Sequence, residues 1–526
     1  MKIINKKLHL YLMSLVVAIS LTSCVQDLDI QPIDPSIVQT FNEPEVFTKV
    51  YAAWALTGQQ GAAGNNDIDI DDEGRFSLYR TLWVTQQLPT DETVCAWGDI
   101  EVVTLNRSAF TSTNPALKGL YSRLYFVVTI ANHYLEQTDK SADDAAIKTK
   151  RAEVRYLRAL AYYYLMDVFG NVPFATEVKA DAPLQIKRAD LFTWIETELK
   201  EIEPQLSEPK QSPYYRVDKV AAWMLFARMY LNAEVYTGTA KWNDAAVYAN
   251  KVIKSPYKLA KNYKYLFMAD NAGTTDGSSV NDAPNEIIFP IAADGIKTKN
   301  WGSSIFVINS TRTAGMNPWG TNDSWGGNRA RVKLIRKFFP QGNVPSMDDL
   351  TGAANDNRAM FSSTNRTLDI SDVTIFKEGI SVQKFWNLRA DGKATSDLQF
   401  PDMDIPFMRA AEAYLTYAEA VVRGASPIDG LTALQAVNSV RDRAKASTLV
   451  SVNKDVILDE WSREFYFEGH RRTDLIRYGY FTGSTYNWDW KGGIANGTSL
   501  PAYLNLMPLP ADDLNANSNL EQNPEY

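Results

Sequence analysis

The sequence has few of the residues that build metal sites, disulfide frameworks or histidine-based active sites. Its 526 residues include only two cysteines and three histidines. A zinc site needs about four clustered ligands and a disulfide framework needs several cysteine pairs, so the counts nearly exclude both. The sequence also contains no P-loop, dinucleotide-binding fingerprint or serine-centred nucleophile elbow. We therefore expect no metal site and no cofactor.

Positive charge is also scarce, because 54 basic residues face 62 acidic ones and the formal net charge is −8. A protein that binds a phosphate backbone needs a basic footprint, so the charge argues against a nucleic-acid partner. Apolar residues make up 45% of the chain. That is enough for a large core, and the length leaves room for two or three domains or one large domain with insertions.

The N-terminal segment predicts export rather than a folded element. Three lysines within the first seven residues precede an apolar run from Leu8 to Leu21, too short to span a bilayer comfortably. The run ends in Leu21-Thr22-Ser23-Cys24, which resembles a bacterial lipobox. We expect residues 1–23 to be a lipoprotein signal peptide and Cys24 to carry the lipid anchor. An ordinary secretory signal with a chance cysteine is the alternative.

Helical periodicity occurs in three blocks, at about 44–57, 115–254 and 404–481. Within them we expect single helices over Val217–Tyr236, Ile405–Val422 and Ile457–Phe481. Pairs of helices joined by short turns resemble tetratricopeptide units, although the repeats are irregular. The predicted fold class is mainly α, with a scaffold of tetratricopeptide-like helical hairpins.

Between these blocks lie three long segments without helical period, at about 58–113, 256–400 and 482–526. Short alternating runs such as Glu286–Ile291 and Val382–Leu388 suggest strands. The tryptophan and tyrosine content argues against disorder. We predict that residues 24–526 form one domain in which these segments make a loop-rich lobe on the scaffold.

Two local features resemble functional sites but lack the residues that those sites require. The acidic run that starts at Asp67 lacks the glycine and glutamate that an EF-hand loop requires at its sixth and twelfth positions, so a solvated acidic turn is expected. Cys95 is the only cysteine besides Cys24, and a packed thiol is favoured over a nucleophile. No pair of carboxylates is singled out for glycoside hydrolysis. We therefore predict a protein that is not an enzyme, with a glycoside hydrolase as the alternative.

Four loop tryptophans carry a more specific signal. Trp97, Trp301, Trp319 and Trp325 are each flanked by glycine or small polar residues, which leaves a ring face uncovered. The axial C–H groups of a pyranose form an apolar patch that stacks on such a face, while nearby carboxylates and guanidiniums bind its hydroxyls. Packing within the loops is the alternative for each ring. Together the four rings favour a carbohydrate-binding surface.

Several segments spread over the chain resemble the RagB/SusD family of outer-membrane nutrient-binding lipoproteins. They are Arg151–Leu160 continuing through Phe169–Pro173, Asp404–Tyr414, Glu464–Asp474, and the tail from Leu509-Pro510 to Asn523–Tyr526. The resemblance implies a helical scaffold of tetratricopeptide-like hairpins with a loop-rich lobe, in agreement with the periodicity. Within the family the chain is most similar to the starch-binding founding member, through Leu28–Pro35, Leu88–Glu92 and Trp488–Gly493.

The resemblance also implies a ligand-binding site. An arc of aromatic rings that cups an α-1,4-glucan helix falls on Trp97, Trp301 and Trp325, and the sugar-binding arginine and aspartate fall on Arg80 and Asp72. Two positions depart from the expected pattern: Cys95 stands where a second aromatic residue is expected, and Ile100 where a polar amide is expected.

The function implied by the resemblance is non-catalytic binding of starch or maltooligosaccharides at the surface of a Gram-negative cell. The protein would be lipid-anchored in the outer membrane and would deliver its glycan to a TonB-dependent, SusC-like porin. The two departures motivate an alternative, a different glycan or a peptide bound on the same fold.

Overall fold

The structure is a computed structural model that describes residues 41–274 and 279–526. The predicted signal peptide and Cys24 lie outside the described residues. From Pro44 to Tyr526 the chain forms one compact unit. No helix in the described ranges is long and apolar enough to span a bilayer.

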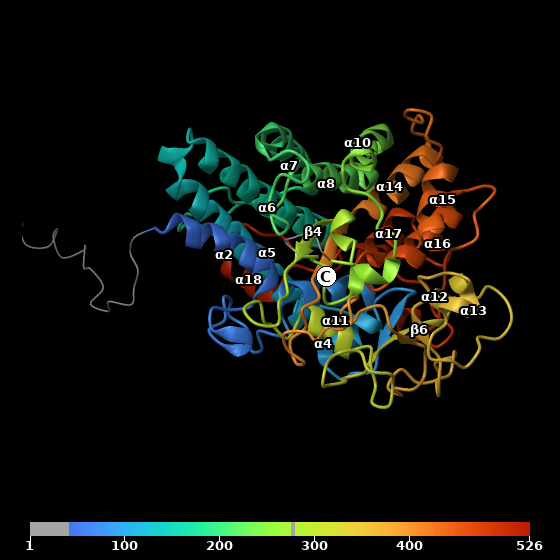
Figure 1. Cartoon of the computed structure of the whole chain (residues 1–526). Helices are drawn as coiled ribbons and strands as arrows, with labels where there is room; N and C mark the ends of the chain where they lie inside the picture. The colour runs from blue at the N-terminus through green and yellow to red at the C-terminus, as the bar shows by residue number, and fades with distance from the viewer. Residues whose placement is uncertain (1–40, 275–278) are drawn as a thin grey trace, which may run out of the picture. The chain divides into compact units, whose positions relative to one another are not determined.

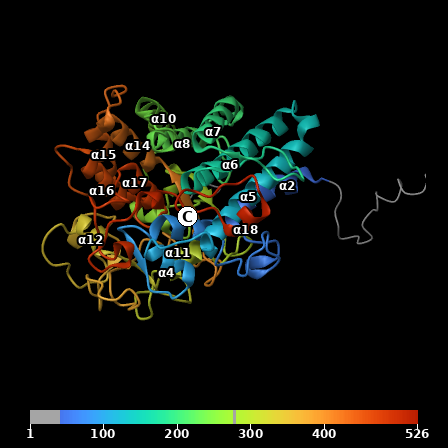
Figure 2. The same ribbon diagram turned by 180° about the vertical axis from the view of Figure 1, so that it is seen from behind.

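Helices dominate this unit, which confirms the predicted fold class (Figures 1 and 2). The helices are α2 (Glu43–Ala55), α3 (Leu78–Gln87), α4 (Ile100–Asn106), α5 (Pro115–Gln137), α6 (Ala145–Phe169), α7 (Arg188–Ile202), α8 (Lys219–Leu231), α9 (Ala233–Thr237), α10 (Trp242–Lys254), α11 (Ser304–Asn309), α12 (Val332–Phe338), α13 (Thr351–Ala354), α14 (Ala410–Arg423), α15 (Ala433–Arg443), α16 (Lys454–Phe465), α17 (Arg471–Arg477) and α18 (Ala511–Ala516).

The strands are short and pair into small antiparallel ladders. They are β1 (Thr93–Cys95) with β5 (Asn328–Ala330), β2 (Val172–Pro173) with β3 (Gln185–Ile186), β4 (Ile287–Ile291) with β8 (Ile405–Arg409), and β6 (Phe361–Ser362) with β7 (Ser381–Val382). The strand predicted over Glu286–Ile291 is confirmed as β4. The one predicted over Val382–Leu388 is wrong beyond Val382, which closes β7.

The scaffold is built from helices that pack in sequence order, α5 on α6, α6 on α7, α8 on α10, α10 on α14 and α14 on α15. In Figures 1 and 2 these helices lie along one side of the unit, and α4, α11 and α12 lie among the loops on the other side. Local signals determine the ends of α5 and α6. The side chain of Asn114 caps α5 ahead of Pro115, and Gly170, with φ of 79°, ends α6.

Three helices predicted as continuous are interrupted. The Val217–Tyr236 helix breaks at Asn232, whose amide donates to Arg228 O at 2.9 Å and accepts from Arg477 at 3.0 Å. The expected helix over Ile457–Phe481 ends at Phe465, because Phe467 takes φ of 64° and its carbonyl accepts a hydrogen bond from Trp83 at 2.8 Å. At Phe467 the competing partner is distant in sequence, whereas at Asn232 the side-chain amide itself bonds the carbonyl four residues earlier and Arg477 holds that side chain in place.

The third interruption converts helix into strand. Ile405–Arg409 is β8, and α14 begins only at Ala410. The strand is buried along its whole length and its backbone pairs with β4. A continuous apolar run suits a buried strand as well as a helix, so periodicity alone did not distinguish them. Conversely, α3, α4, α11 and α12 lie in segments that were expected to be free of helix.

A buried network of ion pairs joins the scaffold to the loop-rich segments. Arg409 of β8 contacts Glu286 at 2.9 Å, Glu464 at 2.5 Å and Glu468 at 2.8 Å. Lys384, from the loop after β7, contacts Glu468 at 2.6 Å. All five side chains are at most 4% exposed, so each charge depends on its partners rather than on water.

Candidate functional site

An open cavity of about 730 Å³ lies among the loops near α3, α4 and α11. Its lining brings together all five predicted site residues, from four segments distant in sequence. The lining residues are Ala63, Asp71, Asp72, Glu73, Gly74, Arg75, Arg80, Trp97, Asp99, Trp301 and Trp325.

Trp301 and Trp325 form a pair on one wall of the cavity. Their ring centroids are 6.4 Å apart and the ring planes are inclined by 38°. The edge of Phe400 supports Trp301 at 4.9 Å. Gly74 leaves room for this indole, since a Cβ at residue 74 would lie 2.4 Å from Trp301 Cβ. Two neighbouring, half-buried rings that are inclined to each other form a curved apolar wall.

The loop after α11 holds Trp325 in place. The Trp325 amide donates to Asn309 O at 2.9 Å, and the indole Nε1–H donates to Asp323 Oδ2 at 2.7 Å. Both bonds orient the ring without covering it, because Trp325 remains part of the cavity wall. The cavity therefore has at least one ring whose position is set before any ligand arrives.

Trp97 lies in the same cavity, packed against Arg80. The Arg80 guanidinium lies 5.3 Å from the Trp97 ring and 4.9 Å from the Phe306 ring, in cation–π contact with both. Gly327 allows the close approach, because its φ is +98° and a Cβ there would lie 2.3 Å from Trp97 Nε1.

Arg80 carries free hydrogen-bond donors. Among the described residues its side chain has neither a carboxylate partner nor a hydrogen-bond acceptor, and only its backbone amide is bonded, to Ser77. Burial lowers the pKa of Arg80 to about 10, which still leaves the guanidinium charged at neutral pH. A planar fork of N–H groups that lines an open cavity is suited to oxygen acceptors, whether hydroxyl, carbonyl or carboxylate.

The lining of the cavity is also acidic. Asp72 Oδ1 accepts the Arg75 amide at 2.9 Å, and its other oxygen is exposed on the rim. Arg75 itself is neutralised, since its guanidinium contacts Glu101 at 2.6 Å and Asp99 at 2.9 Å. Asp71 and Glu73 add further carboxylates to the lining. The rim therefore offers acceptors to a neutral ligand and repels an anionic one.

The solvated acidic turn predicted from Asp67 is correct only in part. Asp69, Asp71 and Asp72 are exposed, but the Asp67 side chain is 2% exposed and forms an ion pair with Lys49 at 2.7 Å. The described part of the chain contains no cluster of three or more metal-ligating side chains.

Comparison of the chain with known proteins identifies its family. The SusD family pattern matches residues 226–526, and a second pattern, described as starch-binding and associating with the outer membrane, matches residues 70–231. The starch-binding protein SusD of Bacteroides thetaiotaomicron is 40% identical over 97% of this chain and 97% of its own length. The chain belongs to the SusD family.

Other similar proteins are more distant from this chain. A SusD-like protein of Bacteroides ovatus is 26% identical over 70% of this chain and 66% of its own length. A surface glycan-binding protein A from Bacteroides thetaiotaomicron, solved in complex with laminarihexaose, superposes with a TM-score of 0.67 over 91% of this chain and 98% of its own, at 20% identity. At that identity the match shows the shared fold.

The two positions that depart from the expected SusD-family pattern both lie outside the cavity lining. Cys95 is buried in β1, and burial raises the pKa of its thiol to about 12, as expected for a packed thiol. Ile100 begins α4 next to the lining residue Asp99, and its side chain is 61% exposed. Ile100 thus lies at the edge of the site, where it could contact a ligand that extends past the rim.

The fourth loop tryptophan does not belong to the site. Trp319 is 8% exposed, its carbonyl accepts the Asn387 amide at 2.8 Å, and its Nε1–H donates to Thr321 at 2.7 Å. The alternative of packing within the loop is therefore correct for Trp319. The flanking residues of Trp319 and Trp325 are so similar that no local signal separates them.

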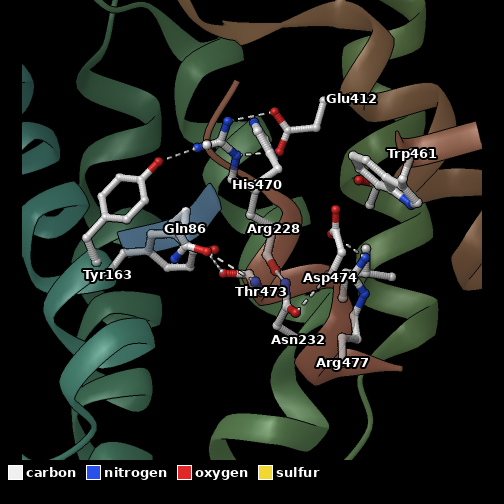
Figure 3. Close-up of a pocket in the computed structure, with 14 residues that line it drawn as sticks. Gln86, Tyr163, Arg228, Asn232, Glu412, Trp461, His470, Thr473, Asp474 and Arg477 are labelled. Carbon is white, nitrogen blue, oxygen red and sulfur yellow. Dashed lines mark hydrogen bonds and ion pairs between the residues drawn. The ribbon is translucent and has the colours of Figure 1, made fainter. Parts of the chain in front are cut away.

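A second cluster, in the scaffold, has the residue types of an active site but lacks the space (Figure 3). His470, Arg228, Glu412, Asp474 and Arg477 surround a cavity of about 40 Å³ between α8, α14, α16 and α17. A water needs about 10–15 Å³ by this measure, so the cavity holds at most a few waters. The polar groups bond one another: the Arg228 guanidinium donates to the Glu412 carboxylate at 2.7 Å, and the Arg477 guanidinium donates to the Asp474 carboxylate at 2.8 Å. Burial, aided by the nearby arginines, lowers the pKa of His470, which favours a neutral structural role.

A larger groove, of about 1010 Å³, runs between α5 and residues 174–190. Its rings are committed to the protein's own packing. Phe174 lies edge-on to Trp194 at 5.0 Å, and the Tyr125 hydroxyl donates to Pro173 O at 2.6 Å. The groove therefore lacks the combination of paired indoles and a free guanidinium found in the first cavity.

Proposed function

We propose that this protein binds starch-like α-1,4-glucans, without cleaving them, in the cavity lined by Trp97, Trp301 and Trp325. The observation that carries the proposal is the convergence of three indoles and the free Arg80 guanidinium in one open cavity. Its volume of about 730 Å³ falls in the range of sites that hold several ligand groups. The 40% identity to the starch-binding protein SusD over nearly the whole chain supports the same ligand class.

The chemistry of the lining accounts for this choice. The inclined faces of Trp301 and Trp325 suit the apolar faces of successive sugar rings along a curved chain, and a flat chain would fit them less well. Arg80 donates to hydroxyl oxygens, and Asp72 accepts from hydroxyl protons. The acidic rim selects against uronic acids and other anionic sugars. Each ring contributes about 1–2 kcal/mol, opposed by the ordering of a flexible glucan, so we expect a Kd of roughly 10 µM to 1 mM.

The biological setting follows from the family and from the N-terminal sequence. We infer that Cys24 carries the lipid anchor, that the protein faces outward from the outer membrane, and that it passes glycans to a TonB-dependent, SusC-like porin. The lipobox Leu21–Cys24 and the family pattern described as associating with the outer membrane support this placement. Many anchored copies would hold one polymer by avidity despite weak individual sites.

A panel of polysaccharides tests the function. In native gels that contain amylose, amylopectin or pullulan we expect retarded migration, and in gels that contain laminarin or a soluble cellulose derivative we expect none. Retardation by laminarin alone would support the alternative of a different glycan, which the structural likeness to a laminarihexaose complex makes worth including. Prolonged incubation with starch should release no new reducing ends; their appearance would establish a glycoside hydrolase instead.

Substitution of Gly74 tests the geometry of the cavity. An alanine Cβ at this position would lie 2.4 Å from Trp301 Cβ, so Gly74→Ala must displace the indole. We expect glucan affinity to fall about 5–30-fold, the contribution of one ring, measured by isothermal titration with maltoheptaose. Gly98→Ala is the matched control, because nothing lies within 4 Å of its added Cβ, and its affinity should be unchanged. Equal maltoheptaose affinities in the two variants would show that Trp301 does not contribute to binding.

A further inference from the structure

A separate polar pocket of about 260 Å³ lies in the loop-rich segments beside α13. Its floor is formed by Met360, Gln383 and Trp386, and its rim carries short polar side chains and one lysine. The rim residues are Asn262, Lys264, Asn317, Asp348, Asp349, Thr351 and Asn357. None of these residues lines the cavity that contains Trp97, Trp301 and Trp325, which we call the indole cavity.

The floor of the pocket presents buried polar groups without protein partners. Gln383 is 6% exposed, and its backbone amide donates to Met360 O at 2.7 Å. Its side-chain amide has no hydrogen-bond partner among residues 41–274 and 279–526. Trp386 is 9% exposed, and within the same ranges its Nε1–H has no acceptor. The Gln383 amide atoms stay accessible to solvent, so they can hydrogen-bond water or a polar ligand in the pocket, whereas the Trp386 Nε1–H is itself buried.

The rim adds an ammonium that no carboxylate neutralises. Lys264 Nζ lies 4.1 Å from the centroid of the Trp386 ring, and the described part of the chain provides it with no ion-pair partner within 4.0 Å. The Arg312 guanidinium lies 4.5 Å from the same ring and donates to Phe385 O at 2.9 Å. The two cations hold the indole in place, so Trp386 acts as a rigid wall rather than as a stacking platform.

The donors and acceptors of the pocket are mixed. Lys264 donates, Asp349 accepts, and the amides of Gln383 and Asn357 do both, while Met360 supplies an apolar contact. Each hydroxyl of a sugar can both donate and accept, so a sugar can hydrogen-bond the donors and the acceptors of such a set. A volume of about 260 Å³ limits the ligand to one ring, whereas the indole cavity has room for several.

We propose that this pocket is a second carbohydrate site, which binds a single neutral pyranose residue through Gln383, Lys264 and Asn357. The pyranose is either a free monosaccharide or the terminal residue of a longer glucan. Because its lining is separate, the site operates whether or not the indole cavity binds starch.

The test uses the mature full-length protein with the indole cavity disabled by Trp301→Ala and Trp325→Ala. Binding is followed by saturation-transfer NMR with D-glucose and with maltohexaose. We expect a saturable millimolar signal to persist in this double variant. A signal with glucose supports a free sugar, a signal with maltohexaose alone supports a chain end, and no signal with either overturns the proposal.

Substitutions in the pocket locate the signal. Adding Gln383→Ala to the double variant should weaken binding about 2–10-fold, the value of one hydrogen bond. Lys264→Met keeps the aliphatic stem and provides a second variant at the rim, should Gln383→Ala fail to fold. Gln341→Ala, at an exposed position outside the pocket, is the matched control. Added to the double variant, it should leave sugar binding unchanged. Unchanged binding in both pocket variants overturns the proposal. Failure of the starch proposal would look different. In that case the wild-type protein would lose no glucan binding when Trp301 and Trp325 are replaced by alanine.

Discussion

Replacement of Trp301 or Trp325 by alanine is expected to abolish retention of the protein in amylose-containing native gels while leaving its fold intact. The two rings form one curved wall, with centroids 6.4 Å apart, so loss of either removes one of the two rings of that wall. Each ring contributes about 1–2 kcal/mol, which corresponds to a 5–30-fold loss of affinity. From an initial Kd in the micromolar to millimolar range, such a loss takes binding below the level that a gel detects.

The fold should survive because both indoles line an open cavity rather than the core. Circular dichroism and thermal unfolding of the variants should match those of the wild type. Trp223→Ala is the matched control, since this half-buried indole lies on α8 of the scaffold, where its Nε1–H donates to Glu203 at 2.7 Å. Full retention of both cavity variants in amylose gels would contradict the assignment of the site.

Replacement of Arg409 by methionine should cause the largest loss of stability from a single substitution considered for this protein. The guanidinium contacts Glu286, Glu464 and Glu468 at 2.5–2.9 Å, and none of the four side chains is more than 4% exposed. Without it three buried carboxylates lose a partner, which typically costs about 3–5 kcal/mol. The midpoint of urea unfolding should fall accordingly.

The control for this prediction is a surface pair. Lys254 and Asp429 form an ion pair in which both side chains are more than half exposed, so Lys254→Met should cost about 0–1 kcal/mol. If the two variants unfold at the same urea concentration, the buried network does not stabilise the fold.

The same network predicts a pH dependence of stability. Burial acts to raise the pKa of Glu464, but Arg443, Arg409 and Arg358 outweigh it and hold this pKa well below its usual range. A carboxyl with a depressed folded pKa stabilises the protein above its unfolded pKa, and this stabilisation is lost as the pH falls toward the folded value. The free energy of unfolding should therefore fall in acid, and less steeply in Arg409→Met, where one of the three cations is absent.

The helices illustrate what local sequence can predict. Periodic apolar residues predicted the helical block that contains α5 and α6, and the Asn114 cap and Gly170 that bound these helices in the structure are signals that act within a few residues. Ile405–Arg409 was misassigned as helix because its conformation depends on pairing with β4, more than a hundred residues earlier in the chain. The same reasoning covers Phe467, where a hydrogen bond from Trp83 ends a helix that the sequence alone would continue.

The binding residues show the same division. Glycine-flanked tryptophans in irregular segments, together with the resemblance to a known family, predict Trp97, Trp301 and Trp325 from the sequence. Local context did not separate Trp319 from Trp325, since the difference arises from the contact of Trp319 with Asn387. The pocket around Gln383 carried no sequence signal, because nothing near a glutamine reveals that its amide lacks a partner.

By itself, the sequence determined the helical hairpins, the loop-rich segments and the kinds of side chain available to bind a sugar, since these depend on composition and on contacts between near neighbours. Tertiary structure alone decided which of the indoles meet, which guanidinium is left without a carboxylate, and which polar side chains are buried unpaired. Those properties are set by distances between segments that are separate in sequence, and they exist only once the chain has packed.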